Sequence, residues 1–157
     1  MTHDTVHENP KKFWDDLPTY LNVLEQKRGW HVTEGVYKSI VINDTYGMPK
    51  SYEDAFNYYN DKFDIYDAQI FTSLGHCEGF GMHEDPDSLL LVGLYGNTTY
   101  AIKENNNDIV LKPGETLYVP KGGLHWGKGS YHPRIIYSLG THREIKKEDV
   151  TYHYDYL

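Results

Sequence analysis

The sequence predicts a mainly β fold, a sandwich or barrel of short strands that follows one or two short helices. Two observations carry this prediction. From residue 65 onward the chain consists of short apolar segments broken by Gly, Pro and Asn, which is typical of all-β domains. Tyrosine, which favours strands, accounts for 15 of the 157 residues. A chain of this length fits one domain, which we expect to span residues 1–157.

The N-terminal part of the chain carries the two helical patterns. Residues 10–28 are expected to form a helix, because apolar residues recur there at helical spacing: Phe13, Leu17, Leu21 and Leu24. Pro18 should kink or split this helix, since proline removes one of its hydrogen bonds. A shorter helix is expected over residues 51–59, with Ser51 as its N-cap and Asp54 three residues later.

The strands are expected to be short and separated by tight turns. Residues 31–42 alternate between apolar and polar side chains and should form one strand. The turn at residues 105–108 contains Asn and Asp, which tolerate positive φ. The C-terminal residues 143–157 should form a tail or an edge strand, which would also suit a contact in a homodimer. The remaining expected strands are residues 67–73, 81–83, 89–94, 98–103, 109–111, 116–119 and 134–139.

Composition narrows the expected partners. The formal net charge is −8, whereas nucleic-acid-binding surfaces cluster Lys and Arg. No segment approaches the roughly 18 apolar residues of a membrane span, and the N-terminus lacks the apolar region of a signal peptide. Cys77 is the only cysteine, so no disulfide can form within the chain and a reducing compartment fits. We therefore expect a cytoplasmic protein that acts on a small molecule or peptide, without nucleic acid or membrane.

The most specific pattern in the sequence is GETLYVPKGGLHWGKG, residues 114–129. Gly114 is followed after five residues by Pro120, after one more by Gly122, and after two more by His125. Pro120 should end a strand, because it cannot donate to a ladder. Gly122 permits a tight bend that returns the chain. The pattern therefore predicts that His125 begins the next strand and points into the mouth of the barrel.

A second pattern supplies two further metal-binding side chains. His83 and Asp85 are two residues apart, so on a strand their side chains share a face. Together with His125 they would place two imidazoles and one carboxylate on one side of an ion. Such a facial triad leaves coordination positions open and is typical of non-haem Fe(II) oxygenases, although Zn, Ni or Mn also suits these ligands. His76 and His132 are rival ligands that lie near these patterns in the sequence.

Four stretches resemble known families. The spacing from Gly114 to His125 resembles the second cupin motif, G-x5-P-x-G-x2-H. Three others are similar to the JmjC-like cupins, in particular their ribosomal-oxygenase-like branch: FGMHEDPD at residues 80–87, LLLVGLYGNTTYAI at residues 89–102 and YSLGTH at residues 137–142. The resemblance implies a double-stranded β-helix, the cupin or jelly-roll barrel, with its core in residues 63–142. Residues 1–62 would then form a helix-containing extension packed on the barrel.

The same resemblance implies Fe(II) as the metal and 2-oxoglutarate as co-substrate of a hydroxylase. The far carboxylate of 2-oxoglutarate needs a cation. In this branch that cation lies two residues beyond a hairpin glycine, which is Gly96 here, and at that position this chain has the uncharged Thr98. Arg134, nine residues after His125, is the candidate replacement, and Thr98 and Tyr100 would add hydroxyl hydrogen bonds. The sequence does not decide whether Arg134 faces the inside of the barrel.

Two other functions remain open at this point. The chain could be a metal-binding cupin of another activity, such as a dioxygenase, isomerase or lyase that does not use 2-oxoglutarate. It could also be a non-catalytic barrel that binds a small ligand. Phe80 and Trp126 are expected to line the substrate mouth, and no catalytic residue beyond the metal ligands is expected.

Overall fold

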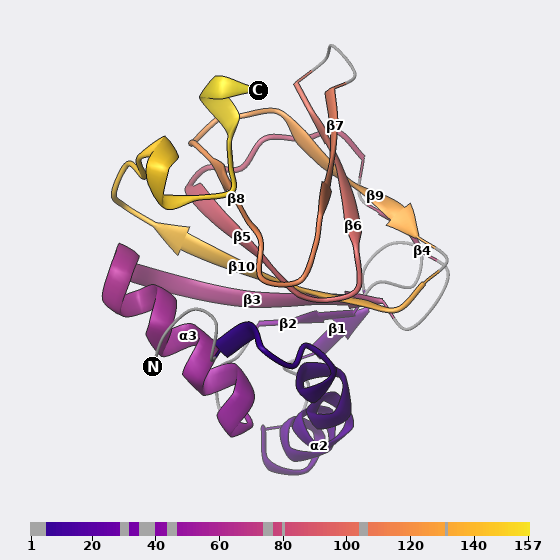
Figure 1. Cartoon of the computed structure of the whole chain (residues 1–157). Coiled ribbons are helices and arrows are strands. Elements are labelled where there is room, and N and C mark those ends of the chain that lie inside the picture. The colour runs from indigo at the N-terminus through magenta and orange to yellow at the C-terminus, as the bar shows by residue number, and fades with distance from the viewer. Residues whose placement is uncertain are drawn as a thin grey trace.

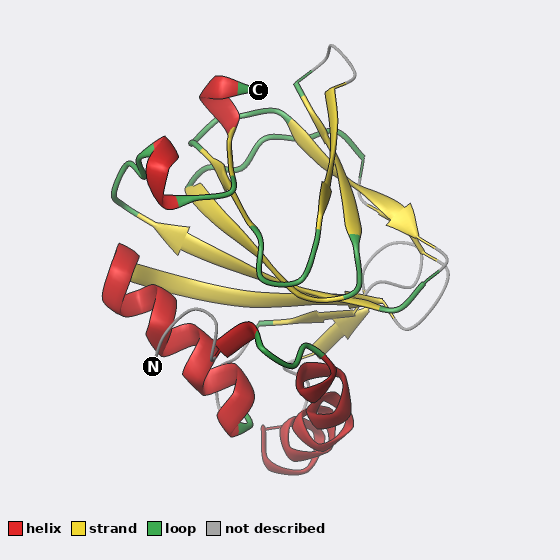
Figure 2. Ribbon diagram, in the orientation of Figure 1, coloured by secondary structure: helices red, strands yellow, loops and turns green. Residues whose placement is uncertain are grey.

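The computed structural model describes residues 6–28, 32–34, 40–43, 47–73, 77–79, 81–103, 107–130 and 132–157. In this part of the chain the strands form two sheets that face each other (Figures 1 and 2). Helices α2 (Lys11–Arg28) and α3 (Lys50–Phe63) lie on the outer side of the larger sheet. The space between the two sheets is the interior of the barrel.

The larger sheet has the order β1-β2-β3-β10-β5-β8-β11, and the smaller sheet has the order β4-β9-β6-β7. Neighbouring strands are antiparallel except for β11, which pairs in parallel with β8 at the edge of the larger sheet. The larger sheet contains β1 (Val32–Glu34), β2 (Ile40–Ile42), β3 (Ile65–Ser73), β10 (Arg134–Thr141), β5 (Ser88–Tyr95), β8 (Thr116–Val119) and β11 (Tyr152–His153). The smaller sheet contains β4 (Cys77–Gly79), β9 (His125–Ser130), β6 (Thr98–Ile102) and β7 (Asn107–Leu111). Two short 3-10 helices, Lys147–Asp149 and Tyr154–Tyr156, flank β11.

Strand β10 shows how alternation divides the interior into two cores. Every residue of β10 is buried, as expected for a central strand that is covered on both faces. The residues that face the helices are Ile135, Tyr137 and Leu139. The residues that face the smaller sheet are Arg134, Ile136 and Ser138. One strand therefore contributes to the helix-packed core with one set of side chains and to the barrel interior with the other.

Aromatic side chains from both helices fill the outer core. Phe13 and Tyr20 of α2 contact Tyr52 of α3 edge to face, with ring centroids 5.4 and 5.5 Å away. The Tyr52 hydroxyl donates to the Phe13 carbonyl oxygen at 2.6 Å, so its polar atom is satisfied despite full burial. Burying a large apolar side chain stabilises the fold by roughly 1.5–3 kcal/mol. These contacts attach the helices firmly to the sheet.

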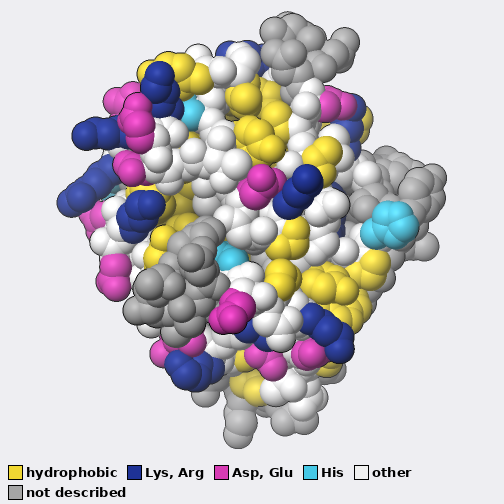
Figure 3. All heavy atoms as spheres, in the orientation of Figure 1, with side chains coloured by type: hydrophobic (Ala, Val, Ile, Leu, Met, Phe, Trp, Pro, Cys, Tyr) yellow, Lys and Arg dark blue, Asp and Glu magenta, His cyan; other side chains and the backbone are white. Residues whose placement is uncertain are grey.

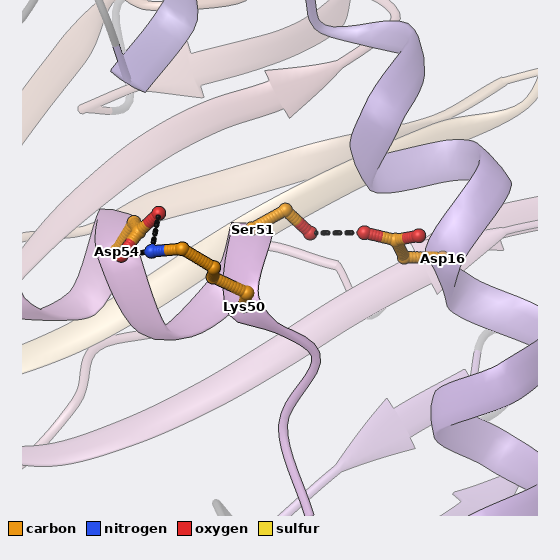
Figure 4. Close-up of polar contacts among 4 residues, drawn as sticks. All are labelled: Asp16, Lys50, Ser51 and Asp54. Carbon is orange, nitrogen blue, oxygen red and sulfur yellow. Dashed lines mark hydrogen bonds and ion pairs between the residues drawn. The ribbon is translucent and has the colours of Figure 1, made fainter.

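The first turn of α3 differs from the predicted cap. Pro49 precedes the helix, and Ser51 lies inside it without capping its N-terminus. The Ser51 hydroxyl instead donates to Asp16 Oδ2 at 2.6 Å and ties α3 to α2 (Figure 4). On the exposed side, Lys50 donates to Asp54 one turn later, at 3.0 Å (Figure 4). The predicted cap was wrong because the Ser51 hydroxyl bonds to Asp16 on α2, which lies far away in the sequence, instead of to a backbone N–H of α3.

Two other local predictions were also wrong, and the split predicted at Pro18 does not occur. Residues 31–42 contain two short strands, β1 and β2, that pair with each other, because alternation along the chain does not reveal a reversal. Pro18 does not split α2, which continues through it to Arg28. Residues 81–83 form no strand, and only His83 makes an isolated bridge there. The packing of the flanking residues Phe13, Leu17 and Tyr20 offsets the hydrogen bond that Pro18 removes.

The surface mixes charges of both signs. On the face shown in Figure 3, basic and acidic side chains are interspersed. Among the described helices, none combines the length and apolar character that a membrane span requires.

Candidate metal centre

The backbone holds the two ligand-bearing segments together. The His83 N–H donates to the His125 carbonyl at 3.0 Å, and the His125 N–H donates back to the His83 carbonyl at 2.9 Å. Gly122, in the turn before His125, donates to the Asp85 carbonyl at 3.2 Å. Lys121 donates its backbone N–H to the Ser88 hydroxyl at 3.0 Å. Two segments that are distant in sequence therefore form one continuous platform at the mouth of the barrel.

The three predicted ligand side chains converge on this platform. His125 Nε2 lies 3.0 Å from Asp85 Oδ2, and His83 Nε2 lies 3.6 Å from the same oxygen. One ligand atom from each residue lies within 4.8 Å of the other two. Among the described residues this is the only group of three such side chains. The two histidines and the carboxylate could therefore hold one metal ion.

Backbone carbonyls set the orientation of both imidazole rings. His83 Nδ1 lies 2.8 Å from the Gly81 carbonyl oxygen, and His125 Nδ1 lies 2.8 Å from that of Gly123. A carbonyl oxygen only accepts, so the hydrogen-bond network assigns the proton to Nδ1 in both rings. The other nitrogen of each ring, Nε2, is the atom that faces Asp85, and it can offer a lone pair to a metal ion when it carries no proton. Such carbonyl partners typically orient metal-ligating histidines.

The converging atoms fit a divalent cation. The pKa of Asp85 is lowered, chiefly by its hydrogen bond with His125 and further by the histidine charges, although burial opposes the shift. A carboxylate oxygen and two Nε2 lone pairs are all acceptors, so they repel one another unless a proton or a metal ion lies between them. Two ligand atoms at about 2.1 Å from an ion and at right angles lie about 3 Å apart. The 3.0 Å separation of His125 Nε2 from Asp85 Oδ2 matches this geometry, whereas the 3.6 Å separation of His83 Nε2 corresponds to a wider angle at the ion.

A cavity of about 130 Å³ adjoins the three ligands. One water molecule needs roughly 10–15 Å³ of such space, so the cavity has room for a small organic molecule. It is lined by Gln69, Phe71, Thr72, His83, Asp85, Leu89, Leu91, Thr98, Tyr100, His125, Gly127, Arg134, Ile136 and Ser138. The cavity thus joins the ligand triad to the three residues predicted to bind a cosubstrate.

Arg134 faces the inside of the barrel, which the sequence left open. It is 8% exposed and lines the cavity together with Ile136 and Ser138. Its Nε donates to Ser73 Oγ at 3.2 Å, and its Nη1 donates to the Lys128 carbonyl at 2.8 Å. These bonds join the two sheets and fix the guanidinium. A buried positive charge therefore stands at a defined place in the cavity wall.

Thr98 and Tyr100 lie on β6, opposite this guanidinium. Thr98 is 2% exposed, and its buried hydroxyl has no hydrogen-bond partner in the described part of the chain. The Tyr100 ring packs on Gly127, where a Cβ would approach it to 3.1 Å. Burial raises the pKa of Tyr100 to about 12, partly opposed by the charge of Arg134, so the phenol stays neutral. Two hydroxyl groups thus accompany Arg134 in one cavity.

Other predicted site residues are placed differently. Trp126 does not line the cavity, because it follows His125 on β9 and its side chain leaves the opposite face of the strand. The ammonium of Lys128, on that same outer face, lies 5.9 Å from the Trp126 ring centroid. His132 is exposed and is not part of the ligand group. His76 and Phe80 lie outside the described residues.

Sequence reasoning missed the wall formed by β3. Gln69 of β3 lies opposite Ser138 of β10, which in turn lies opposite Leu91 of β5. All three side chains line the cavity. The alternation of β3 could have grouped Gln69 with Phe71, but only the register shows which face of β3 meets the ligands.

The fold and the site together define a cupin barrel with a candidate metal centre, as the sequence predicted. No protein-family model and no curated protein matches the sequence. Among solved structures, the crystal structure of the Escherichia coli ribosomal oxygenase YcfD is similar, with a TM-score of 0.57 and 21% identity. That match covers 73% of this chain and 34% of the YcfD chain, as does the match to YcfD in complex with cobalt and 2-oxoglutarate, which has the same TM-score and identity.

A third structure, YcfD with cobalt and succinic acid, has a TM-score of 0.55 and 21% identity over 78% of this chain and 36% of that one. This chain therefore spans about a third of the length of the oxygenase that it resembles. Likeness at this identity shows the shared cupin fold and does not establish a shared activity.

Proposed function

We propose that this protein is an Fe(II)- and 2-oxoglutarate-dependent oxygenase that hydroxylates its substrate. The observation that carries the proposal is a single cavity with complementary groups at its two ends. A cluster of two histidines and one aspartate lies at one end, and a buried arginine with an unpartnered threonine hydroxyl lies at the other. A dicarboxylate with a keto group next to one carboxylate has matching chemistry at both of its ends.

The pairing of β5 with β10 supports the placement of the metal ligands and Arg134 at opposite ends of the cavity. Asp85 comes just before β5, which begins at Ser88. Arg134 begins β10, where the next residue, Ile135, pairs with Tyr95 at the far end of β5. The metal ligands and the guanidinium therefore approach the cavity from opposite ends of the same strand.

At the ligand end, the protein holds three donor atoms on one side of a common point. His83, Asp85 and His125 would bind the ion through Nε2, a carboxylate oxygen and Nε2, with the opposite positions left open. Iron bound there would supply the activation of O2. The carbonyls of Gly81 and Gly123 keep both rings oriented, so the side chains need little rearrangement.

At the other end, the protein offers a fixed cation and neutral hydroxyl donors. The guanidinium of Arg134 is held by Ser73 and by the Lys128 carbonyl, so little conformational freedom remains to be lost on binding a carboxylate. Thr98 and Tyr100 would donate their hydroxyl hydrogens to the same carboxylate. The pKa of Tyr100, raised by burial, keeps that donor protonated at neutral pH. A buried cation also favours an anionic ligand over a neutral one.

A second candidate is a metal cupin that does not use 2-oxoglutarate. It is favoured by the hydrogen bonds that Arg134 already makes within the protein, since these give the arginine a structural role. In that case the metal ligands would act on a different small substrate in the same cavity.

Metal analysis and succinate release separate these candidates. The protein is purified without a histidine tag, its metal is quantified, and the iron form is incubated with 2-oxoglutarate under air. The proposal predicts stoichiometric metal and release of succinate, with faster release in the presence of a true substrate. Bound metal without succinate would favour the second candidate, and absence of metal binding would reject both.

A further inference from the structure

Two polar side chains in the cavity have no role in metal or cosubstrate binding as proposed above. Ser138 of β10 and Gln69 of β3 lie directly opposite each other in the sheet and both line the cavity. We call this pair the Ser138–Gln69 ledge. Ser138 is 6% exposed, and no hydrogen bond joins its hydroxyl to another described residue. Gln69 donates its side-chain N–H to Asn43 Oδ1 at 2.7 Å, and its carbonyl oxygen makes no such bond with the described residues.

The ledge lies on the larger-sheet wall, on the ligand side of Arg134, and its half-buried member Gln69 reaches the protein surface. Ser138 is four residues from Arg134 on the same strand, a separation of ~13 Å at ~3.3 Å per residue. Ser138 also lies opposite Leu91, three residues into β5 from the end that adjoins the metal ligands. The ledge is thus a third group of polar atoms, apart from the cosubstrate anchor and from the ligand triad.

The charges that line the cavity restrict what can bind at the ledge. Apart from the histidines, the charged lining residues are Arg134 and Asp85. When the cosubstrate engages the arginine and the metal engages the aspartate, the other described side chains in the wall are all uncharged. The ledge itself offers no opposite charge to an ionic group, so it favours a neutral group that can exchange hydrogen bonds.

We propose that the Ser138–Gln69 ledge binds a neutral carboxamide of the primary substrate and so presents a neighbouring carbon to the metal centre. This inference rests on the proposed oxygenase function. A carboxamide both donates and accepts, and so do the Ser138 hydroxyl and the Gln69 side-chain amide. The Gln69 carbonyl accepts the substrate N–H, and the Ser138 hydroxyl donates to the substrate carbonyl. Both partners leave the unbound protein with hydrogen-bonding capacity that the fold does not use.

Three planar probes of nearly equal shape test which ligand charge the ledge prefers and whether the ligand binds at the ledge. Propionamide is neutral, propionate is an anion and propionamidinium is a cation. Binding is measured by saturation-transfer NMR on the zinc-loaded protein with saturating 2-oxoglutarate. Propionamide should give the strongest signal, and the signal should fall at least about threefold in Ser138→Ala and Gln69→Leu, since each loses about one hydrogen bond. Equal signals from all three probes, or an unchanged propionamide signal in both variants, would overturn the proposal.

Matched variants separate binding from folding. Ser51→Ala makes the same change far from the cavity, where it removes the bond to Asp16 (Figure 4), and it should lower stability without changing the propionamide signal. Ser138→Ala should do the opposite, because its hydroxyl contributes no hydrogen bond to the fold. Asn43→Ala controls for the Gln69–Asn43 contact and should preserve propionamide binding. A propionamide signal that fell in Ser51→Ala as much as in Ser138→Ala would contradict the ledge.

Failure of the proposed function gives a different result. If 2-oxoglutarate does not bind but propionamide binds and depends on Ser138, the oxygenase proposal fails and the ledge stands. If 2-oxoglutarate binds normally and propionamide binding is independent of both ledge residues, the ledge fails and the oxygenase proposal stands.

Discussion

His83 and His125 pair through their backbones, with each N–H donating to the other's carbonyl oxygen at 3.0 and 2.9 Å. Their side chains project from this bridge toward the same carboxylate oxygen of Asp85. The bridge depends on main-chain atoms, so the ligand arrangement does not require an ion to assemble it. A preformed site of this kind allows the ligands to be changed singly without losing the platform that carries them.

His125→Ala should abolish metal binding and leave the fold intact. Loss of a ligand should reduce affinity by more than roughly 100-fold, because even outer-shell partners are worth 10–100-fold. Elemental analysis after dialysis measures bound metal, and far-ultraviolet circular dichroism checks the fold. His132→Ala is the matched control, since this exposed histidine lies outside the ligand group and should retain full metal content. Full metal content in His125→Ala would remove His125 from the site.

Asp85→Asn should change the pH dependence of stability in the metal-free protein. The fold lowers the pKa of Asp85 from 3.8, chiefly through the hydrogen bond with His125. A lowered carboxyl pKa contributes stability above the unfolded-state value, and the contribution disappears as pH falls through the folded-state value. Urea unfolding should therefore show the wild type more stable than Asp85→Asn at pH 5–6, with the difference shrinking below about pH 4. A constant difference across this range would contradict the assigned interaction.

Arg134→Met should weaken 2-oxoglutarate binding while metal binding persists. A hydrogen-bonded charge contributes about 1.5–3 kcal/mol, so the expected loss of affinity is roughly 10- to 100-fold. Methionine keeps much of the side-chain volume, which limits cavity formation in the buried site. Lys128→Met is the matched control: its ammonium pairs with Asp108 at 2.6 Å, and its backbone carbonyl still accepts from Arg134. Calorimetric titration that gives equal affinities for both variants would exclude Arg134 as the anchor.

Thr98→Val should weaken 2-oxoglutarate binding without reducing the stability of the fold. Valine has a similar shape and removes a buried hydroxyl that lacks a partner, so the free energy of unfolding should stay constant or rise by about 1 kcal/mol. Thr72→Val is the contrasting control, because the Thr72 hydroxyl donates to the Arg134 carbonyl at 2.8 Å and its loss should destabilise. Urea unfolding and 2-oxoglutarate titration on the same samples provide both measurements.

Gly96→Ala should destabilise the hairpin that brings Thr98 to Arg134. Gly96 has φ +68°, and a Cβ there would overlap the Pro133 carbonyl oxygen. Gly81→Ala is the control, because Gly81 has φ +82° but no heavy atom within 4 Å of its ideal Cβ. In Gly81→Ala the free energy of unfolding should fall by only about 1–2 kcal/mol, the cost of a Cβ at positive φ. In Gly96→Ala it should fall by more, because the overlap with Pro133 adds to that cost. Equal midpoints in urea would show that the hairpin tolerates the overlap.

Local patterns were sufficient for much of the fold. The strand predicted at residues 116–119 is β8 to the residue, because Gly114 and Pro120 bound it on either side. The helix predicted over residues 10–28 is present as α2, because its regularly spaced apolar side chains pack into the outer core. Both predictions rest on residues close together in the sequence. Helical spacing and the backbone effects of Gly and Pro also act over only a few residues, so the local sequence is sufficient to predict these elements.

Predictions that depend on distant partners were less secure. The local sequence predicts Ser51 as a cap, but its hydroxyl bonds to Asp16 on another helix. It predicts Trp126 at the substrate mouth, but strand alternation from His125 directs this side chain outward. No local pattern indicates Gln69, because its place in the cavity follows from its pairing with Ser138 across β3 and β10.

The sequence alone determined the residue types of the candidate metal-binding triad and the turn that precedes His125, because the spacing of Gly, Pro and His acts through local backbone geometry. The tertiary structure decided that His83 and Asp85 meet His125, and that Arg134 faces the same cavity as Thr98. Those relations depend on strand register, and a shift of one residue would turn every side chain of a strand to its other face. Register is set by packing between strands far apart in the chain, so only the folded molecule contains it.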